Sequence, residues 1–88
     1  MSPSQTQHLR DTLLRTAREY PRGLSIETLR VCLQAAGFTA AQVQQLDTHL
    51  LYLSDKGLIR RVDKTHTPEL EVWRITSEGI DDLARRGL

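Results

Sequence analysis

The sequence predicts an α+β domain with a three-helix core, a C-terminal β-hairpin and a final short helix. Three observations lead to this expectation. Apolar residues recur at helical spacing in three successive segments up to about Lys56. The spacing then changes to two from Leu58 to Val62 and from Leu70 to Ile75, and Thr76 begins a last amphipathic segment. With 88 residues, the chain is expected to form a single domain over residues 1–88.

The first two helices are each placed by a capping residue. Ser4 is a candidate N-cap for a helix through about Glu19, and Pro21 follows its end. Residues 22–24 allow a very short extended segment, after which Ser25 is placed to cap the second helix. The residues expected to face inward are Leu9, Leu13, Thr16, Ala17 and Tyr20 in the first helix and Ile26, Leu29, Leu33 and Ala36 in the second.

The third helix has the clearest start signal. Thr39 is followed three positions later by Gln42, which is the pattern of a capping box. The helix is expected to continue to about Lys56, where Gly57 ends it. Its buried face would hold Val43, Leu46, Leu50 and Leu53. Because only residues 37–39 separate it from the second helix, the two helices are expected to turn sharply, as in a helix-turn-helix motif.

The hairpin and the last helix complete the predicted domain. The polar segment DKTHTP joins the two strands as an exposed loop of about six residues. Trp73 shares a strand face with Ile75, so we expect its side chain to pack the hairpin onto the helices; the alternative is an exposed ring that stacks on a nucleic-acid base. Thr76 is expected to cap the last helix, with Ile80, Leu83 and Ala84 facing inward.

The residues LSDKGLIRR, followed by WRITSEGIDDL, resemble the closing half of many bacterial winged-helix proteins. The resemblance covers about half of the chain closely and the whole chain in the order of its elements. It implies a winged helix-turn-helix DNA-binding domain of the transcriptional-regulator type. The third helix would enter a DNA major groove, and the hairpin wing would touch a flanking backbone or minor groove. The short chain is also similar, more weakly, to small winged-helix proteins of Mu-like phages and prophages.

The exposed face of the third helix is polar and provides candidate DNA contacts. These residues are Gln42, Gln44, Gln45, Thr48, His49 and Tyr52. Gln can pair with adenine, Thr can contact a base or the thymine methyl group, and Tyr and His can reach phosphates. We expect Gln44, Gln45 and Thr48 to be the leading base-reading residues. The competing interpretation is that this face is simply solvated.

Positive charge for the DNA backbone is expected from the wing, because the third helix contains no arginine. The candidate wing contacts are Arg60, Arg61, Lys64 and His66. The competing interpretation is that the arginines only discourage pairing of the hairpin edge with another strand. The formal net charge is +1 and the pI about 8.0, so any positive surface must be local.

Composition disfavours other classes of protein. The single Cys32 cannot form an internal disulfide, and no apolar run has the length of a signal sequence or membrane span, so we expect a cytoplasmic protein. The three histidines and Cys32 lie on different predicted elements without metal-ligand spacing, and no glycine-rich phosphate loop is present. We therefore expect neither an enzyme nor a cofactor, metal or small-molecule site.

The second functional hypothesis is a protein-interaction or dimerisation module of the same fold, such as a phage accessory protein that does not bind DNA. A domain this small gains stability from a second copy. Leu14 lies off the buried stripe of the first helix, as a rim residue or a contact with another chain, and Val31, Leu70 and Val72 are further candidates for exposed apolar positions. One contiguous apolar patch of a few hundred Å² would favour this hypothesis.

Overall fold

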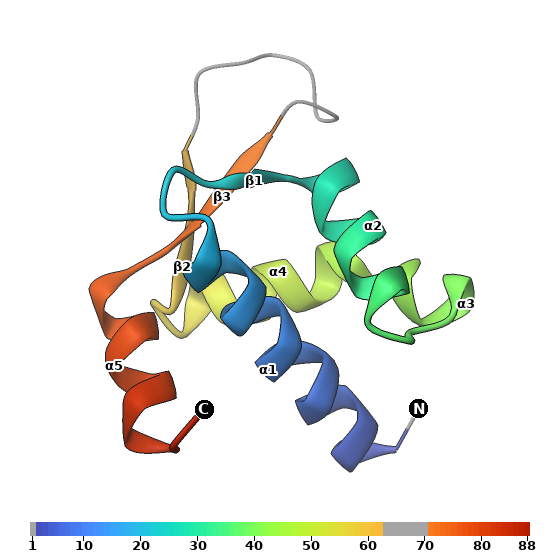
Figure 1. Ribbon diagram of the computed structural model, residues 1–88, viewed down its shortest axis with the longest axis horizontal. Helices are drawn as coiled ribbons and strands as arrows, with labels where there is room; N and C mark the ends of the chain where they lie inside the picture. Colours follow the sequence, from blue (N-terminus) through green and yellow to red (C-terminus); the bar gives the residue numbers. More distant parts are fainter. Residues whose placement is uncertain (1, 63–70) are drawn as a thin grey trace.

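The computed structural model describes residues 2–62 and 71–88, which contain five helices and three strands (Figure 1). The α+β class predicted from the sequence is confirmed. The elements are α1 (Pro3–Glu19), β1 (Leu24–Ser25), α2 (Ile26–Ala35), α3 (Ala40–Val43), α4 (Leu46–Asp55), β2 (Ile59–Val62), β3 (Val72–Ile75) and α5 (Ser77–Arg85).

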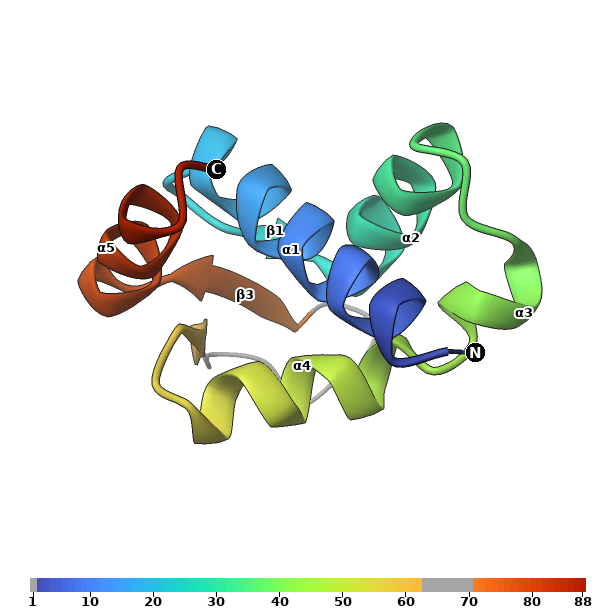
Figure 2. The same ribbon diagram turned by 90° about the horizontal axis from the view of Figure 1, so that it is seen from below.

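The three strands form an antiparallel sheet in the order β1-β3-β2. Leu24 pairs with Trp73 across β1 and β3, while Ile59 pairs with Ile75 and Arg61 with Trp73 across β2 and β3. The short extended segment expected before α2 is thus a strand, although it begins at Leu24. In Figure 2, α1 runs between α5 and α2, and α4 crosses the other side of the sheet region.

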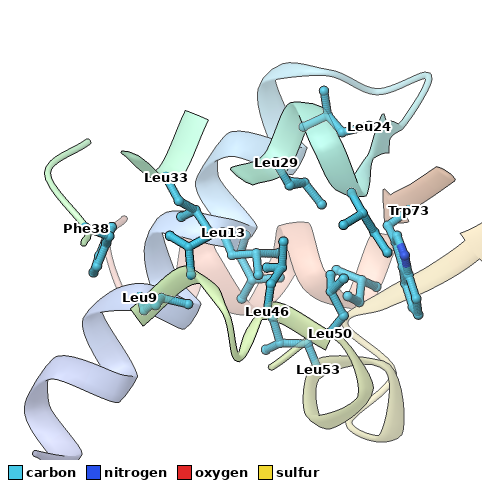
Figure 3. Packing of buried hydrophobic residues seen from close by; sticks show 14 of the residues in the cluster. Leu9, Leu13, Leu24, Leu29, Leu33, Phe38, Leu46, Leu50, Leu53 and Trp73 are labelled. Atoms are coloured by element: carbon cyan, nitrogen blue, oxygen red, sulfur yellow. The ribbon is translucent and has the colours of Figure 1, made fainter. Parts of the chain in front are cut away.

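Leucines from α1, α2 and α4 make up most of the hydrophobic core, and the hairpin contributes Trp73 (Figure 3). Trp73 is buried, and Ile75 packs against the same cluster. The expectation that Trp73 packs the hairpin onto the helices is therefore confirmed. Among the described residues, its indole Nε1 has no hydrogen-bond partner.

Helix α1 begins two residues earlier than the sequence suggested. Ser2, not Ser4, is the N-cap: the backbone N–H of Gln5 donates to Ser2 Oγ, and the N–H of Ser2 donates to Gln5 Oε1. Pro3 suits the first helical position because the N–H that it lacks would have had no intrahelical partner there. The predicted caps Ser25, Thr39 and Thr76 are confirmed.

Several expectations about which side chains face inward are wrong. Leu14, expected at a rim or chain contact, is buried at 1% exposure because α5 packs beside α1 and covers that side of the helix. Conversely, Tyr20, Ala36, Ile80 and Ala84 were expected inside but are exposed.

Gly79 helps to bring α5 against the sheet. A Cβ atom placed on Gly79 would lie only 2.2 Å from the carbonyl oxygen of Leu58, so only a glycine allows this approach. Thr76 Oγ1 also donates to the carbonyl oxygen of Gly57. Within the described ranges, no helix combines the length and apolarity needed to cross a membrane.

The third helix of the sequence prediction is two helices in the structure. The four-residue α3 ends at Val43, and Gln44 and Gln45 form a turn before α4. The N–H of Gln45 bonds the carbonyl of Gln42, three residues back, at a long 3.4 Å. The division follows tertiary packing, because α3 packs on α2, while Leu46 starts the buried face of α4. The short connection expected after the second helix joins α2 to α3 over residues 36–39, whereas residues 36–45 separate α2 from the longer α4.

Candidate nucleic-acid interface

Helix α4 is buried on one side and exposed on the other. Its buried residues are Leu46, His49, Leu50 and Leu53, and its exposed residues are Asp47, Thr48, Leu51, Tyr52 and Asp55. Thr48 and Tyr52 are one helical turn apart and therefore lie on the same exposed strip. Gln45 is exposed at the N-cap position directly before the helix. The structure thus brings three of the predicted contact residues to one side of α4.

Gln42 and Gln44 lie outside α4. Gln42 is half-buried, and its Oε1 accepts a hydrogen bond from the backbone N–H of Thr39 at 2.8 Å, so its amide belongs to the cap of α3. Gln44 is exposed in the turn and borders a hollow of about 300 Å³ beside Arg30 of α2. The break between α3 and α4 therefore separates these two glutamines from the strip that holds Thr48 and Tyr52.

His49 is only 3% exposed, so the expectation that it lies on an open flank of the helix is wrong. The Arg10 side chain of α1 lies against it, and Arg10 Nε donates a hydrogen bond to His49 Nδ1 at 3.3 Å. Burial, and to a lesser extent the positive charge of Arg10, lowers the pKa of His49. The imidazole is therefore neutral at pH 7, and the accepting role of Nδ1 assigns its proton to Nε2. Nε2 has no partner among the described residues.

Arg10 contributes positive charge to α4 from a different helix. Its guanidinium carbon lies 3.6 Å from the centre of the Tyr52 ring, and Lys56 Nζ lies 5.6 Å from the same centre. Both distances are within the range of cation–π attraction. Sequence reasoning missed Arg10, which is 39 positions away from His49. The sequence contained one indication of the position of Arg10: it directly follows Leu9 and so lies at the edge of the buried stripe of α1.

A cleft of about 470 Å³ adjoins these cations between α1, α4 and α5. Apolar side chains from Leu14, Leu53 and Leu58 line part of it. The charged groups at the cleft are Arg10, Lys56, Asp82 and Arg86. Arg86 Nη2 pairs with Asp82 at 2.7 Å. Among the described residues at this cleft, Arg10 and Lys56 therefore have no acidic partner.

The hairpin side of α4 has a different character. A hollow of about 220 Å³ is lined by Ile26, Asp47, Leu51, Arg61, Glu71 and Trp73. Arg61 Nη1 forms an ion pair with Glu71 Oε1 at 3.0 Å, which neutralises the arginine charge on this side. Leu51 is 60% exposed.

Arg60 lies on the opposite face of the hairpin from Arg61. It is paired with Arg74 across β2 and β3, whereas Arg61 is paired with Trp73 on the core side. The two wing arginines therefore face in different directions. Lys64 and His66, also predicted as wing contacts, lie outside the described residues.

Within residues 2–62 and 71–88, no three His, Cys, Asp or Glu side chains gather as a metal site. Cys32 is a half-buried free thiol. The candidate functional site in the described part of the chain is the exposed side of α4 with its neighbouring cations. In comparisons with known proteins, no family model, curated protein or solved structure matches this chain.

Proposed function

We propose that this protein is a winged helix-turn-helix domain that binds double-stranded DNA, with α4 in the major groove and a role in transcriptional regulation. The observation that carries the proposal is the exposed polar strip of Gln45, Thr48 and Tyr52 on a helix whose other side is anchored in the core. The order α1, β1, α2, α3, α4, β2 and β3, with strand β2 of the sheet beside α4, is compatible with this fold family.

In this arrangement the side chains have separate roles. Gln45 and Thr48 would contact base edges, because amide and hydroxyl groups can hydrogen-bond bases in the major groove. Tyr52 would contact the sugar-phosphate backbone, a common partner of tyrosine hydroxyls. Gln44 would sit near the start of the helix but outside the base-reading strip.

The charges predict an affinity that is modest for a DNA-binding domain. Asp47 and Asp55 are exposed on α4 itself and repel phosphates. The cations near α4 or in the hairpin that have no ion pair with the described residues are Arg10, Lys56, Arg60 and Arg74. About four phosphate contacts give a slope of log K against log salt near −3.6 for duplex DNA.

The test is a titration of random-sequence duplex DNA at several salt concentrations. Thr48→Glu places a negative charge in the middle of the strip, and we expect it to weaken binding about tenfold or more. Ala84→Glu adds the same charge at an exposed position of α5 and serves as the matched control, with an expected change below about twofold. The DNA proposal is wrong if the wild type does not bind even at low salt, or if both variants weaken binding equally.

A second candidate function is self-association through the hairpin side of α4. It is favoured by Leu51, whose side chain is 60% exposed next to the hollow that Ile26 and Trp73 line. Asp47, Arg61 and Glu71 at the same hollow provide charges of both signs, which a second copy can complement. Light scattering tests this candidate: a dimer mass that Leu51→Ser reduces to a monomer supports it, and a monomeric wild type excludes it at that concentration.

A further inference from the structure

The guanidinium of Arg10 is held in place by two neutral groups. Its Nε donates to the imidazole Nδ1 of His49 at 3.3 Å, and its Cζ lies 3.6 Å from the centre of the Tyr52 ring. A planar guanidinium can stack on a ring and still use its outer N–H groups for hydrogen bonds. Neither Nη atom of Arg10 has an acceptor among residues 2–62 and 71–88.

Four other arginines of the described residues are neutralised by carboxylates. Arg30 pairs with Glu27, Arg61 with Glu71, Arg85 with Asp82, and Arg86 with Asp11 and Asp82. Arg10 therefore differs from them, because its position is fixed while its charge is not compensated by an acid.

Two acids close to Arg10 already have other partners: Asp82, which lines the same cleft, and Asp11, the next residue in the chain. Asp82, which shares the cleft with Arg10, binds Arg86 at 2.7 Å and Arg85 at 3.6 Å. Asp11 accepts a hydrogen bond from Gln7 at 2.8 Å and also contacts Arg86. Asp55, exposed near the end of α4, reduces the local positive potential but forms no ion pair with Arg10.

The width of the DNA major groove makes the edge of α4, where Arg10 and Lys56 lie, suitable for phosphate contacts. An α-helix with its side chains is about 10–12 Å wide, and the groove is about 12 Å wide. Cations at the edge of a helix that fills the groove therefore lie beside the sugar-phosphate backbone. Arg10 and Lys56 meet this condition, because both contact the ring of Tyr52, which is 39% exposed on α4.

We propose that Arg10 and Lys56 bind neighbouring DNA phosphates on the α1 side of α4, and that His49 acts as a positioning residue for Arg10. This inference rests on the DNA-binding function proposed above. It adds a backbone contact from α1, a helix to which the sequence assigned none. The terminal N–H groups of Arg10 donate to phosphate oxygens, and Lys56 adds a second positive charge.

The role of His49 follows from its chemistry. A neutral imidazole accepts the Nε–H of Arg10 without neutralising the guanidinium, whereas a carboxylate at the same place would cancel the charge that the phosphate requires. The lowered pKa of His49 keeps it in this accepting form at neutral pH.

The test measures the salt dependence of duplex binding for the full chain and for Arg10→Gln. We expect the slope of log K against log salt to become shallower by about 0.9, the value for one phosphate contact. Arg15→Gln is the matched control, because Arg15 is an exposed arginine of the same helix, and it should leave the slope unchanged. Lys56→Gln should also make the salt slope shallower, by part of the change expected for Arg10→Gln. Because Lys56 is exposed, Lys56→Gln should fold, so it tests the site even if Arg10→Gln does not fold.

The positioning role needs a separate comparison. His49→Gln retains an acceptor for Arg10 Nε and should keep most of the wild-type slope, whereas His49→Leu removes the acceptor and should approach the slope of Arg10→Gln. Circular dichroism confirms that each variant is folded at the assay temperature. Equal slopes for these two His49 variants would refute the positioning role.

The possible results separate this inference from the proposed function. If the wild type binds DNA and Arg10→Gln and Lys56→Gln keep its slope, the phosphate site is wrong while DNA binding stands. If the wild type does not bind duplex DNA, both proposals are wrong. A selective loss of slope in Arg10→Gln but not in Arg15→Gln supports both.

Discussion

The two sides of helix α4 differ in how their charges are used. On the α1 side, Arg10 and Lys56 lie around Tyr52, and their charges are not neutralised by the described residues. On the hairpin side, Arg61 is paired with Glu71, and the hollow beside it contains the exposed Leu51. The sequence placed the cations for DNA on the hairpin. The difference shows that the availability of a charge depends on its partners, which are not adjacent in the chain.

The largest effect is expected from the residue that attaches the hairpin to the core. Trp73→Ala should lower the free energy of unfolding by about 3–5 kcal/mol, because it leaves a cavity where the indole was buried. Urea denaturation followed by circular dichroism measures this change. Trp73→Phe is the control and should lower the free energy of unfolding by less. It keeps an aromatic ring, and the N–H that it removes has no hydrogen-bond partner among the described residues. A loss below about 1 kcal/mol for Trp73→Ala would contradict the buried position.

On the α1 side, the buried His49 should make stability depend on pH. Its pKa in the folded state is below the ordinary value of 6.5, so the unfolded chain takes up the proton more readily. The stabilisation that neutral His49 gives to the folded state is therefore complete above about pH 6.5, and it is lost as the pH falls through the folded-state pKa. The free energy of unfolding cannot change through His49 by more than about 1.4 kcal/mol per pH unit, the limit for one proton.

The measurement is the free energy of unfolding from about pH 7.5 to 5, compared between wild type and His49→Gln. The difference between the two proteins isolates His49 from the carboxylates, which are common to both. If the two curves run parallel over this range, the titration of His49 does not affect stability.

On the hairpin side, releasing Arg61 from its ion pair should make it available to DNA. Glu71→Gln is expected to steepen the salt dependence of binding by about 0.9, as one added phosphate contact would. The loss of a partly exposed ion pair should change stability by no more than about 1 kcal/mol. Glu27→Gln, which releases Arg30 from an ion pair of the same 3.0 Å length on α2, is the matched control. An unchanged slope would mean that the hairpin side does not approach the duplex.

The smallest effect is expected at Leu51. Because its side chain is largely exposed, Leu51→Ala should change the stability of the monomer by less than about 0.5 kcal/mol. The adjacent Leu50 is fully buried, so Leu50→Ala should cost about 2–5 kcal/mol. Thermal or urea denaturation of the two variants compares neighbouring positions on opposite sides of one helix. A large loss for Leu51→Ala in dilute solution would indicate that this side chain is covered.

Local signals predicted much of the fold. The caps at Ser25, Thr39 and Thr76 depend on residues within three positions, so the sequence alone identified them. The alternation of Trp73 and Ile75 likewise predicted the core-facing side of the hairpin. Ser4, predicted as the first cap, is not the cap of α1; Pro3 directly after the observed cap Ser2 is a local signal for the earlier start.

Other features depend on contacts between distant segments and could not be predicted in this way. Leu14 is buried because α5 lies beside α1, and His49 is buried where the Arg10 side chain of α1 lies against it. The turn at Gln44 and Gln45 contains no proline or glycine, so no local residue predicted a break there. For the candidate site, Gln45, Thr48 and Tyr52 keep their expected exposure, while the contribution of Arg10 became visible only in three dimensions.

Trp73 is the only tryptophan in the chain, and it lines the hollow on the hairpin side of α4. The protein therefore carries a built-in fluorescent probe for one of the two sides. A second copy that covers Leu51 would change the polarity around the indole and shift its emission. Occupation of the Arg10 and Lys56 edge would leave the environment of the indole largely as it is. Emission spectra recorded during a titration can thus report which side of the helix a partner has reached, without any attached label.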